Sequence, residues 1–190
     1  TKSWFYVGPL GDGYSRWKEP DFTAQYWPGD ADIFQRPAEM TALLSGLPRR
    51  ARRDALRTLR GSLLRSELYA LDNPDLQDIP YTVTESRMSL RVEFEPSQSP
   101  VPLWNEKNEY WSGSGYVFFP FNVAQRTSQY ERGNDPMHSV SFTRGYDPYG
   151  QAQGQLNVAV PRGGWPQSGG NGNYLASYTL TEYIYKNERD

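Results

Sequence analysis

Glu93 and Glu95 flank Phe94 at the spacing used by ADP-ribosyltransferases, in which two carboxylates on one strand face orient the ribose and the acceptor. Alternate residues of a strand share a face, so both carboxylates would lie on the solvent side of an amphipathic strand. The sequence has no Ser-Thr-Ser strand to accompany them. We therefore expect two solvated strand residues here and no transferase site.

Asp30 and Asp32 have a spacing that could bind a divalent cation together with a nucleotide sugar. They follow a Pro-Gly pair, however, and an Asp in such a loop more often caps an Asx turn. His138 is the single histidine and there is no cysteine, which excludes a double-histidine or thiolate zinc site. We expect His138 to be a hydrogen-bonded residue beside the strand predicted at 140–143.

A nucleophilic serine is suggested only by the run Ser112-Gly113-Ser114-Gly115. This run lacks the leading glycine of a nucleophile elbow and is more typical of a flexible turn. We assign no catalytic, cofactor-binding or metal-binding residue anywhere in the chain, and we expect a protein that is not an enzyme.

Arginine dominates one segment of the sequence, with six arginines in twelve residues: Arg49, Arg50, Arg52, Arg53, Arg57 and Arg60. Such a face could contact phosphates, and aromatic residues elsewhere could stack on bases. The net charge of the chain is -2, which argues against long-range attraction to nucleic acid. A docking surface within a larger assembly and a solvated helix face are the two remaining interpretations.

Composition favours a sheet protein. Aromatic residues make up 15% of the 190 residues and hydrophobic residues only 37%, so Tyr and Trp must cover surface that Leu and Ile cover elsewhere. No run of about 18 apolar residues exists, so we expect no membrane span. The sequence starts at Thr1 with neither Met nor a hydrophobic signal region, and we expect a fragment of a larger protein.

Two short helices are predicted between residues 37 and 60. Pro37 can occupy the first turn of one helix, and Pro48 restarts the second. The apolar residues of the second helix fall on one stripe: Ala51, Ala55, Leu56 and Leu59. We interpret this pair as an insertion that packs on a sheet.

A hairpin is predicted directly after the helices, with strands at 61–72 and 80–85 joined by an Asp-Asn-Pro-Asp turn. Its first strand is expected to be extended and well buried through Leu63, Leu64, Leu68, Tyr69 and Leu71. A clean period of two follows, in which Met88, Leu90, Val92 and Phe94 alternate with polar residues. Further aromatic strands are predicted at 116–121, 140–143, 156–160 and 174–185.

The hairpin at 61–85 closely resembles the middle to C-terminal region of the B component of bacterial insecticidal toxin complexes, the TcdB-like proteins. Segments 4–8 and 26–30 are similar to those that precede this hairpin in the family, and 130–132 with 135–136 match its pattern. The segment 145–151, Gly-Tyr-Asp-Pro-Tyr-Gly-Gln, resembles one YD unit of Rhs repeats. In such a unit we expect Tyr146 to pack against the next strand, Asp147 and Pro148 to form the corner and Gly150 to supply the turn.

The resemblance implies a structural role. In this family the B and C components make a hollow shell of β-strands around a toxic polypeptide, and the A component forms the channel. We therefore expect one mainly β module over 1–190, an antiparallel sheet with a helical insertion at 37–60 and a YD-like hairpin at 138–160, as part of an Rhs-type shell. The partners implied are the rest of the shell, a C-component-like toxin polypeptide and a channel-forming A component, with no nucleic acid. The implied location is secreted.

A wall element should carry unpaired strand edges, which we expect at 88–94 and 178–184. The alternative interpretation is a carbohydrate-binding β-domain, because the six tryptophans could supply platforms on which sugars stack. They are Trp4, Trp17, Trp27, Trp104, Trp111 and Trp165. A sugar site requires two or three exposed, roughly coplanar rings in one groove, whereas a shell segment should bury its tryptophans or place them at seams.

Overall fold

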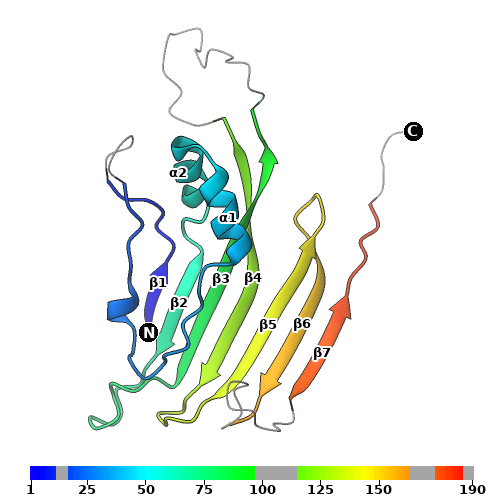
Figure 1. Cartoon of the computed structure of the whole chain (residues 1–190). Helices are drawn as coiled ribbons and strands as arrows, with labels where there is room; N and C mark the ends of the chain where they lie inside the picture. Colours follow the sequence, from blue (N-terminus) through cyan, green and yellow to red (C-terminus); the bar gives the residue numbers. More distant parts are fainter. Residues whose placement is uncertain (12–16, 97–114, 163–173, 186–190) are drawn as a thin grey trace.

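A computed structural model describes residues 1–11, 17–96, 115–162 and 174–185 of the chain. The described residues form one seven-stranded antiparallel sheet in which each strand neighbours the next along the sequence (Figure 1). The strands are β1 (Lys2–Phe5), β2 (Leu63–Leu68), β3 (Thr82–Phe94), β4 (Val117–Gln129), β5 (Met137–Tyr146), β6 (Ala152–Val160) and β7 (Leu175–Leu180). The mainly β, antiparallel prediction is confirmed.

The predicted helical insertion is also confirmed, as α1 (Ala38–Gly46) and α2 (Arg49–Arg57). Pro37 and Pro48 stand immediately before the two helices, where a missing backbone donor costs no helical hydrogen bond. A short 3₁₀ turn, η1 (Thr23–Gln25), precedes them. In the part of the chain that the structure describes, no helix combines the length and apolar character that crossing a membrane requires.

The main hydrophobic core lies between the helix pair and one face of the sheet. The predicted stripe of α2 is buried there with two residues of α1, Met40 and Leu44. Leu90 of β3 and Phe118 of β4 supply the sheet side of this core. The core therefore occupies only the end of the sheet that the helices cover (Figure 1).

The β2–β3 hairpin forms as predicted, with Arg65 opposite Glu85 in the register. The burial expected along β2 is wrong. Leu68 is 47% exposed and Leu71 is 86% exposed, whereas Arg65 and Glu67 are fully buried. The reason is that residues 26–36 cover the face of β2 that carries the charged side chains, so strand alternation turns Leu68 away from that cover, while Leu71 lies beyond the end of β2.

Strand β3 keeps the predicted alternation only in part. A register shift between Arg87 and Met88 interrupts the pairing with β4, and Phe94, beyond the core, is 56% exposed. The edge expected at 88–94 is present among the described strands, because β2 pairs only with residues 82–85 of β3 and the stretch 88–94 pairs with β4 alone. The edge expected near 178–184 is present: β7 pairs with β6 and is the last strand of the described sheet.

The C-terminal half of the sheet is a single layer. The helices and the N-terminal segment lie over the β1–β4 half and leave β5, β6 and β7 uncovered (Figure 1). Every residue of β7 is exposed. Among the described residues, this half holds buried residues such as Val140 and Val160 but lies outside the main hydrophobic core.

Candidate functional site

A cluster of five ionised side chains is buried beneath residues 26–36: Asp30, Arg65, Glu67, Glu85 and Arg126. Asp30 Oδ2 lies 2.8 Å from Arg65 Nη1 and 2.7 Å from Arg126 Nη2, so this one carboxylate bridges β2 and β4. Arg65 Nε also lies 2.8 Å from Glu67 Oε1, and Arg126 Nη2 lies 3.0 Å from Glu85 Oε2. All five side chains are at most 3% exposed, so water does not screen these pairs.

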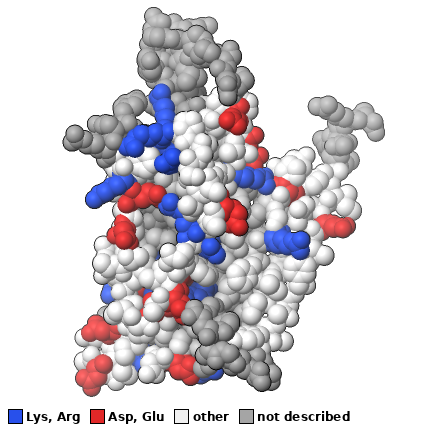
Figure 2. All heavy atoms as spheres, in the orientation of Figure 1, with Lys and Arg blue, Asp and Glu red and all other residues white. Residues whose placement is uncertain are grey.

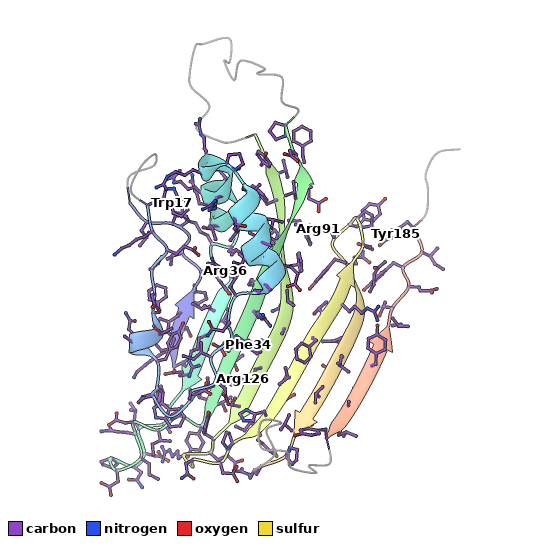
Figure 3. All side chains as sticks on the ribbon, viewed as in Figure 1. Trp17, Phe34, Arg36, Arg91, Arg126 and Tyr185 are labelled. Atoms are coloured by element: carbon purple, nitrogen blue, oxygen red, sulfur yellow. The ribbon has the colours of Figure 1, made fainter. Side chains whose placement is uncertain are left out.

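Two backbone amides attach the covering segment to the same cluster. Trp27 N donates to Glu67 Oε1 at 2.9 Å, and Phe34 N donates to Glu85 Oε2 at 3.1 Å. The ring of Phe34 also lies under Arg126, 5.6 Å from its guanidinium carbon (Figure 3). Segment 26–36 is thus fastened to three neighbouring strands by charge-assisted hydrogen bonds.

Two tyrosines complete the cluster. Tyr130 donates its hydroxyl to Asp30 Oδ1 at 3.0 Å, and Tyr69 donates to Glu67 Oε2 at 2.6 Å. Burial and the neighbouring carboxylates raise the pKa of both phenols above the ordinary value. Burial also raises the pKa of the Glu85 carboxyl, although Phe34 N and Arg126 oppose that change. The phenols therefore remain protonated donors to the carboxylates.

Asp30 differs from the Asx turn expected of it, because its side chain accepts hydrogen bonds from two arginines and a tyrosine. Asp32 is exposed and does not join it. Within the described ranges, no group of three or more His, Cys, Asp or Glu side chains could hold a metal ion. The charged side chains of this cluster therefore pair with one another inside the protein.

The turn between β5 and β6 is organised by Asp147, which is 5% exposed. Its Oδ1 accepts from Tyr149 N at 2.9 Å and from Gln151 N at 2.8 Å, and its carbonyl accepts from Gly150 N at 3.0 Å. Gly150 has a φ of +81°, and a Cβ at this position would approach the Phe119 ring to 2.7 Å. The corner roles expected of Asp147 and Gly150 match this geometry.

Tyr146 anchors the same corner to β4. Its hydroxyl donates to the Asn122 carbonyl at 2.7 Å, and its ring lies against Phe121 at 5.2 Å between centroids. Arg91 of β3 reaches across β4 and donates to the carbonyls of Tyr146 and Asp147, both at 3.1 Å (Figure 3). The expectation that Tyr146 packs against the next strand is wrong: it packs on β4, the strand that precedes its hairpin, because Phe119 and Phe121 of β4 flank its ring.

Residues 181–185 return to this corner after β7. Tyr185 donates its hydroxyl to Asp147 Oδ2, and its ring lies 4.4 Å from that of Tyr149. Tyr183 donates to the Ala152 carbonyl at 3.1 Å. Asp147 thus connects the β5–β6 corner with the segment that follows the edge strand.

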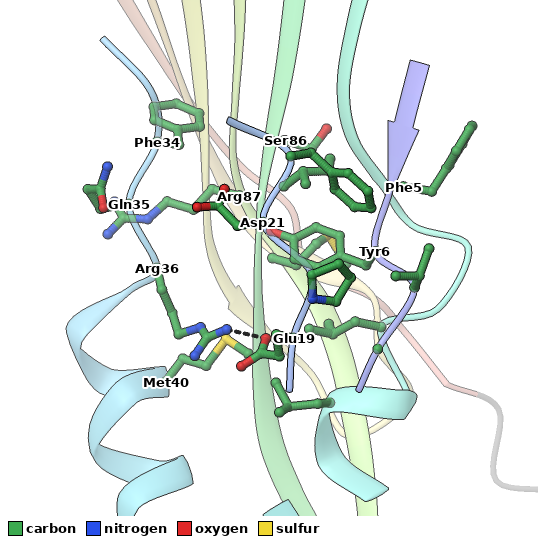
Figure 4. A pocket seen from close by; sticks show the side chains of 18 residues that line it. Phe5, Tyr6, Glu19, Asp21, Phe34, Gln35, Arg36, Met40, Ser86 and Arg87 are labelled. Carbon is green, nitrogen blue, oxygen red and sulfur yellow. Dashed lines mark hydrogen bonds and ion pairs between the residues drawn. The ribbon is translucent and has the colours of Figure 1, made fainter. Parts of the chain in front are cut away.

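A cavity of about 300 Å³ lies between the N-terminal segment, the helices and β3 (Figure 4). Aromatic and aliphatic side chains line most of it, including Phe5, Tyr6, Phe22, Phe34, Met40 and Met88. Its ionised side chains are Glu19, Asp21, Arg36 and Arg87. Burial raises the pKa of the Tyr6 phenol, so this hydroxyl is neutral.

The candidate carboxylates of β3 have separate partners. Glu93 forms an ion pair with Arg91, whereas Glu95 accepts a hydrogen bond from the Tyr116 hydroxyl at 2.9 Å. His138 Nδ1 lies 2.8 Å from Ser128 Oγ across the β4–β5 pair, as a hydrogen-bonded strand residue. Of the run at 112–115, the first three residues lie outside the described residues.

The arginines of α2 contact the protein itself in several places. Arg49 lies over the Trp17 ring at 5.1 Å, Arg52 Nη2 donates to the Ser45 carbonyl at 3.3 Å, and Arg60 Nε donates to the Val7 carbonyl at 2.8 Å. On the face shown in Figure 2, basic side chains near the helices are interspersed with acidic ones. This arrangement fits internal packing better than a continuous phosphate-binding surface.

The tryptophans that the structure describes are half-buried and occupied by neighbours. Trp4 packs edge-on against Tyr26 at 5.0 Å, and Trp27 packs edge-on against Tyr130 at 4.6 Å. Trp17 carries Arg49 on its face. The other three tryptophans, at 104, 111 and 165, lie outside the described residues. The rings of these three tryptophans therefore pack against neighbouring side chains and do not line one common groove.

Sequence reasoning did not find the buried cluster, although a signal was present. Charged residues alternate at Arg65 and Glu67 and recur at Glu85 within the predicted hairpin, and Arg126 follows the strand predicted at 116–121. A charged pair of opposite sign on one strand face, opposite another on the next strand, indicates mutual neutralisation. The contribution of Asp30 could not be seen, because it lies 35 residues from Arg65.

Comparisons with known proteins agree on one family. The family model described as the insecticide toxin TcdB middle/C-terminal region matches residues 54–187. The crystal structure of TcdB2-TccC3 is 33% identical with a TM-score of 0.51, over 64% of this chain and 5% of that chain. The Tc holotoxin pore of Photorhabdus luminescens is 29% identical with a TM-score of 0.55, over 77% of this chain and 6% of that chain. Among curated protein sequences, none matches this chain.

Proposed function

Because this chain belongs to the TcdB family of insecticide toxins, we propose that it is a non-enzymatic wall segment of a shell that encapsulates and helps deliver a toxic polypeptide. The match covers the middle/C-terminal region of that family, and the chain corresponds to 5% to 6% of the length of the solved relatives. A segment of this size contributes strands to a larger enclosure. We place it in a secreted toxin complex.

The observation that carries this proposal is the bare edge of the sheet. Leu175, Leu180 and Ile184 are 75%, 72% and 99% exposed, and Tyr178 is 48% exposed. Apolar side chains gathered along one edge usually mark a surface that another protein element covers. Neighbouring strands of a shell would cover these side chains and satisfy the backbone of β7.

The polar groups support the same role. Four ion pairs join the carboxylates and guanidiniums of the buried cluster, and Asp147 is fully engaged by the corner that it forms. The corner joins β4, β5 and the segment after β7 and has the features of an Rhs-type YD unit. We propose that residues 1–190 act as one module, with the 37–60 insertion and the 138–160 hairpin as parts of it. Its partners would be the rest of the shell, a C-component polypeptide and a channel-forming A component.

A chimeric TcdB2 tests this function. Residues 54–187 would replace the matching region of TcdB2, and the chimera would be co-expressed with TccC3. We expect the purified complex to protect TccC3 from a protease about as well as unaltered TcdB2 does. Introducing Leu175→Asp and Leu180→Asp into the chimera should accelerate digestion, because a charged edge cannot pair closely with the next wall element.

Two results would contradict the proposal. One is a chimera that binds TccC3 but leaves it as sensitive to protease as TccC3 alone. The other is failure to bind TccC3 under conditions in which unaltered TcdB2 binds it, with the chimera itself folded by circular dichroism.

A further inference from the structure

We propose that the cavity between the N-terminal segment, the helices and β3 binds a small monocarboxylate with an apolar body, and that Arg87 binds the carboxylate. The cavity volume of about 300 Å³ and its mixed aromatic and charged lining are those of a ligand site. This inference does not depend on the wall function, because it concerns the covered end of the sheet and not its bare edge.

Two acidic and two basic side chains line the cavity, and one of the basic ones has no ion-pair partner among the described residues. Glu19 forms an ion pair with Arg36. Asp21 Oδ1 accepts from Thr23 N at 2.9 Å and from Thr23 Oγ1 at 2.8 Å, and these bonds lower the pKa of the Asp21 carboxyl. Three of the four ionised lining residues are therefore already engaged.

Arg87 is the fourth. Its side chain extends from β3 into the group of residues that line the cavity (Figure 4). Among the described residues it forms no recorded ion pair, and its Nε is buried without a hydrogen-bond partner. A buried donor without a partner carries a desolvation cost that a bound anion removes. The planar guanidinium presents two parallel N–H groups, which match a carboxylate.

The charge balance also selects the kind of anion. A single unpaired guanidinium neutralises one negative charge. The carboxylates of Glu19 and Asp21 line the same space and would repel a dianion such as phosphate. A cation would compete with existing partners, because Glu19 is ion-paired with Arg36 and Asp21 accepts two hydrogen bonds from Thr23. A monoanion fits this balance.

The rest of the lining calls for an apolar ligand body. The rings of Phe5, Phe22 and Phe34 and the side chains of Met40 and Met88 surround the space. Ligand pockets span about 300 to 1,000 Å³, so this cavity suits a molecule with one ring and not a larger cofactor. Phenylacetate has the required size, charge and apolar ring and serves as the probe.

Calorimetric titration of the full 190-residue chain with three probes tests the inference. Phenylacetate should bind about tenfold or more tightly than phenylacetamide, which has the same shape without the charge, and than acetate, which lacks the ring. Equal affinity for phenylacetate and phenylacetamide would overturn the role of Arg87. No measurable binding of phenylacetate at millimolar concentration would overturn the site.

A matched pair of variants locates the anion. Arg87→Gln should weaken phenylacetate binding by about tenfold and leave phenylacetamide binding unchanged. Arg144→Gln removes the same charge from an exposed position on β5 outside the cavity and should change neither. If both variants weaken phenylacetate equally, the effect is one of overall charge and the proposal fails. The comparison of probes in the unaltered chain holds even if Arg87→Gln folds poorly.

Discussion

Asp30 holds two arginines and a tyrosine in a buried site, and this arrangement replaces hydrophobic contacts between segment 26–36 and the sheet. Burying ions is expensive, and it is tolerated only when partners and hydrogen bonds satisfy each charge. Here three strands and the covering segment supply those partners. The geometry therefore fixes where segment 26–36 crosses the strands, since no other position places Asp30 between Arg65 and Arg126.

Replacing Asp30 should destabilise the folded protein. Asp30→Asn leaves Arg65 and Arg126 short of their shared carboxylate, and we expect the free energy of unfolding to fall by about 3 kcal/mol. Asp32→Asn makes the same chemical change at an exposed site and should shift it by less than about 0.5 kcal/mol. Urea denaturation followed by circular dichroism measures both. Equal effects of the two substitutions would show that the cluster does not fasten the segment.

His138 should make stability depend on pH. Burial, and then the positive charge of Arg126, lower its pKa below the ordinary value, against the weaker influence of Asp30, Asp32 and Asp135. Neutral imidazole is thus favoured in the folded state, so its contribution is present above about pH 6.5 and is lost as the pH falls through the folded pKa.

The matched comparison for this effect is His138→Gln, which cannot gain a proton. Between about pH 8 and about pH 5, the unaltered chain should lose more stability than the variant, as measured by urea denaturation at each pH. The raised pKa of Glu85 acts in the opposite direction but is common to both proteins. A variant that loses as much stability as the unaltered chain would rule out His138 as the titrating group.

At the level of elements, the β5–β6 corner depends on one backbone conformation. Gly150 at φ +81° lies against the Phe119 ring, while Asp147 holds the turn from within. Only glycine adopts such a φ without strain and without a Cβ that would meet the ring. The corner therefore fixes the register between β5 and β6.

Gly150→Ala should lower the free energy of unfolding by about 2 kcal/mol, because it combines backbone strain with a close contact to Phe119. Gly46→Ala, at the last residue of α1, meets no atom within 4 Å and should be neutral or stabilising by up to about 1 kcal/mol. Thermal denaturation of both variants checks this. A Gly150→Ala protein as stable as Gly46→Ala would mean that the turn tolerates another conformation.

Much of this fold could be predicted from the sequence because its signals are local. The apolar stripe that ends at Leu59, the proline before each helix and the alternation around Leu90 each report on neighbouring residues. The burial of Arg65 could not be predicted from local patterns, because charged residues in a strand are normally expected to face solvent. Its environment is set by Asp30 and by strand pairing, which are distant in sequence.

In the whole molecule, the two halves of the sheet differ in how much of their surface other segments cover. The β1–β4 half is covered by helices and by segment 26–36, whereas β7 has every residue exposed and pairs only with β6 in the described sheet. A strand edge with apolar side chains is a template for pairing with another strand. In a larger assembly, neighbouring strands would therefore cover this exposed half.

The isolated 190-residue chain should associate through this edge. We expect light scattering with size-exclusion chromatography to show an apparent mass that rises with concentration. Leu175→Lys with Leu180→Lys should return it to a monomer, because charged residues on an edge oppose strand pairing. Leu71→Lys places the same charge at a residue that is 86% exposed in the β2–β3 connection, and association should persist. A strict monomer across a wide concentration range would contradict the open edge.

Electron cryo-microscopy of the TcdB2 chimera in complex with TccC3 can show whether this chain is a wall segment. We expect residues 54–187 to lie within the wall of the shell and β7 to be hydrogen-bonded to a further strand along its open edge. Density that places these residues outside the wall, with β7 still unpaired, would contradict this expectation.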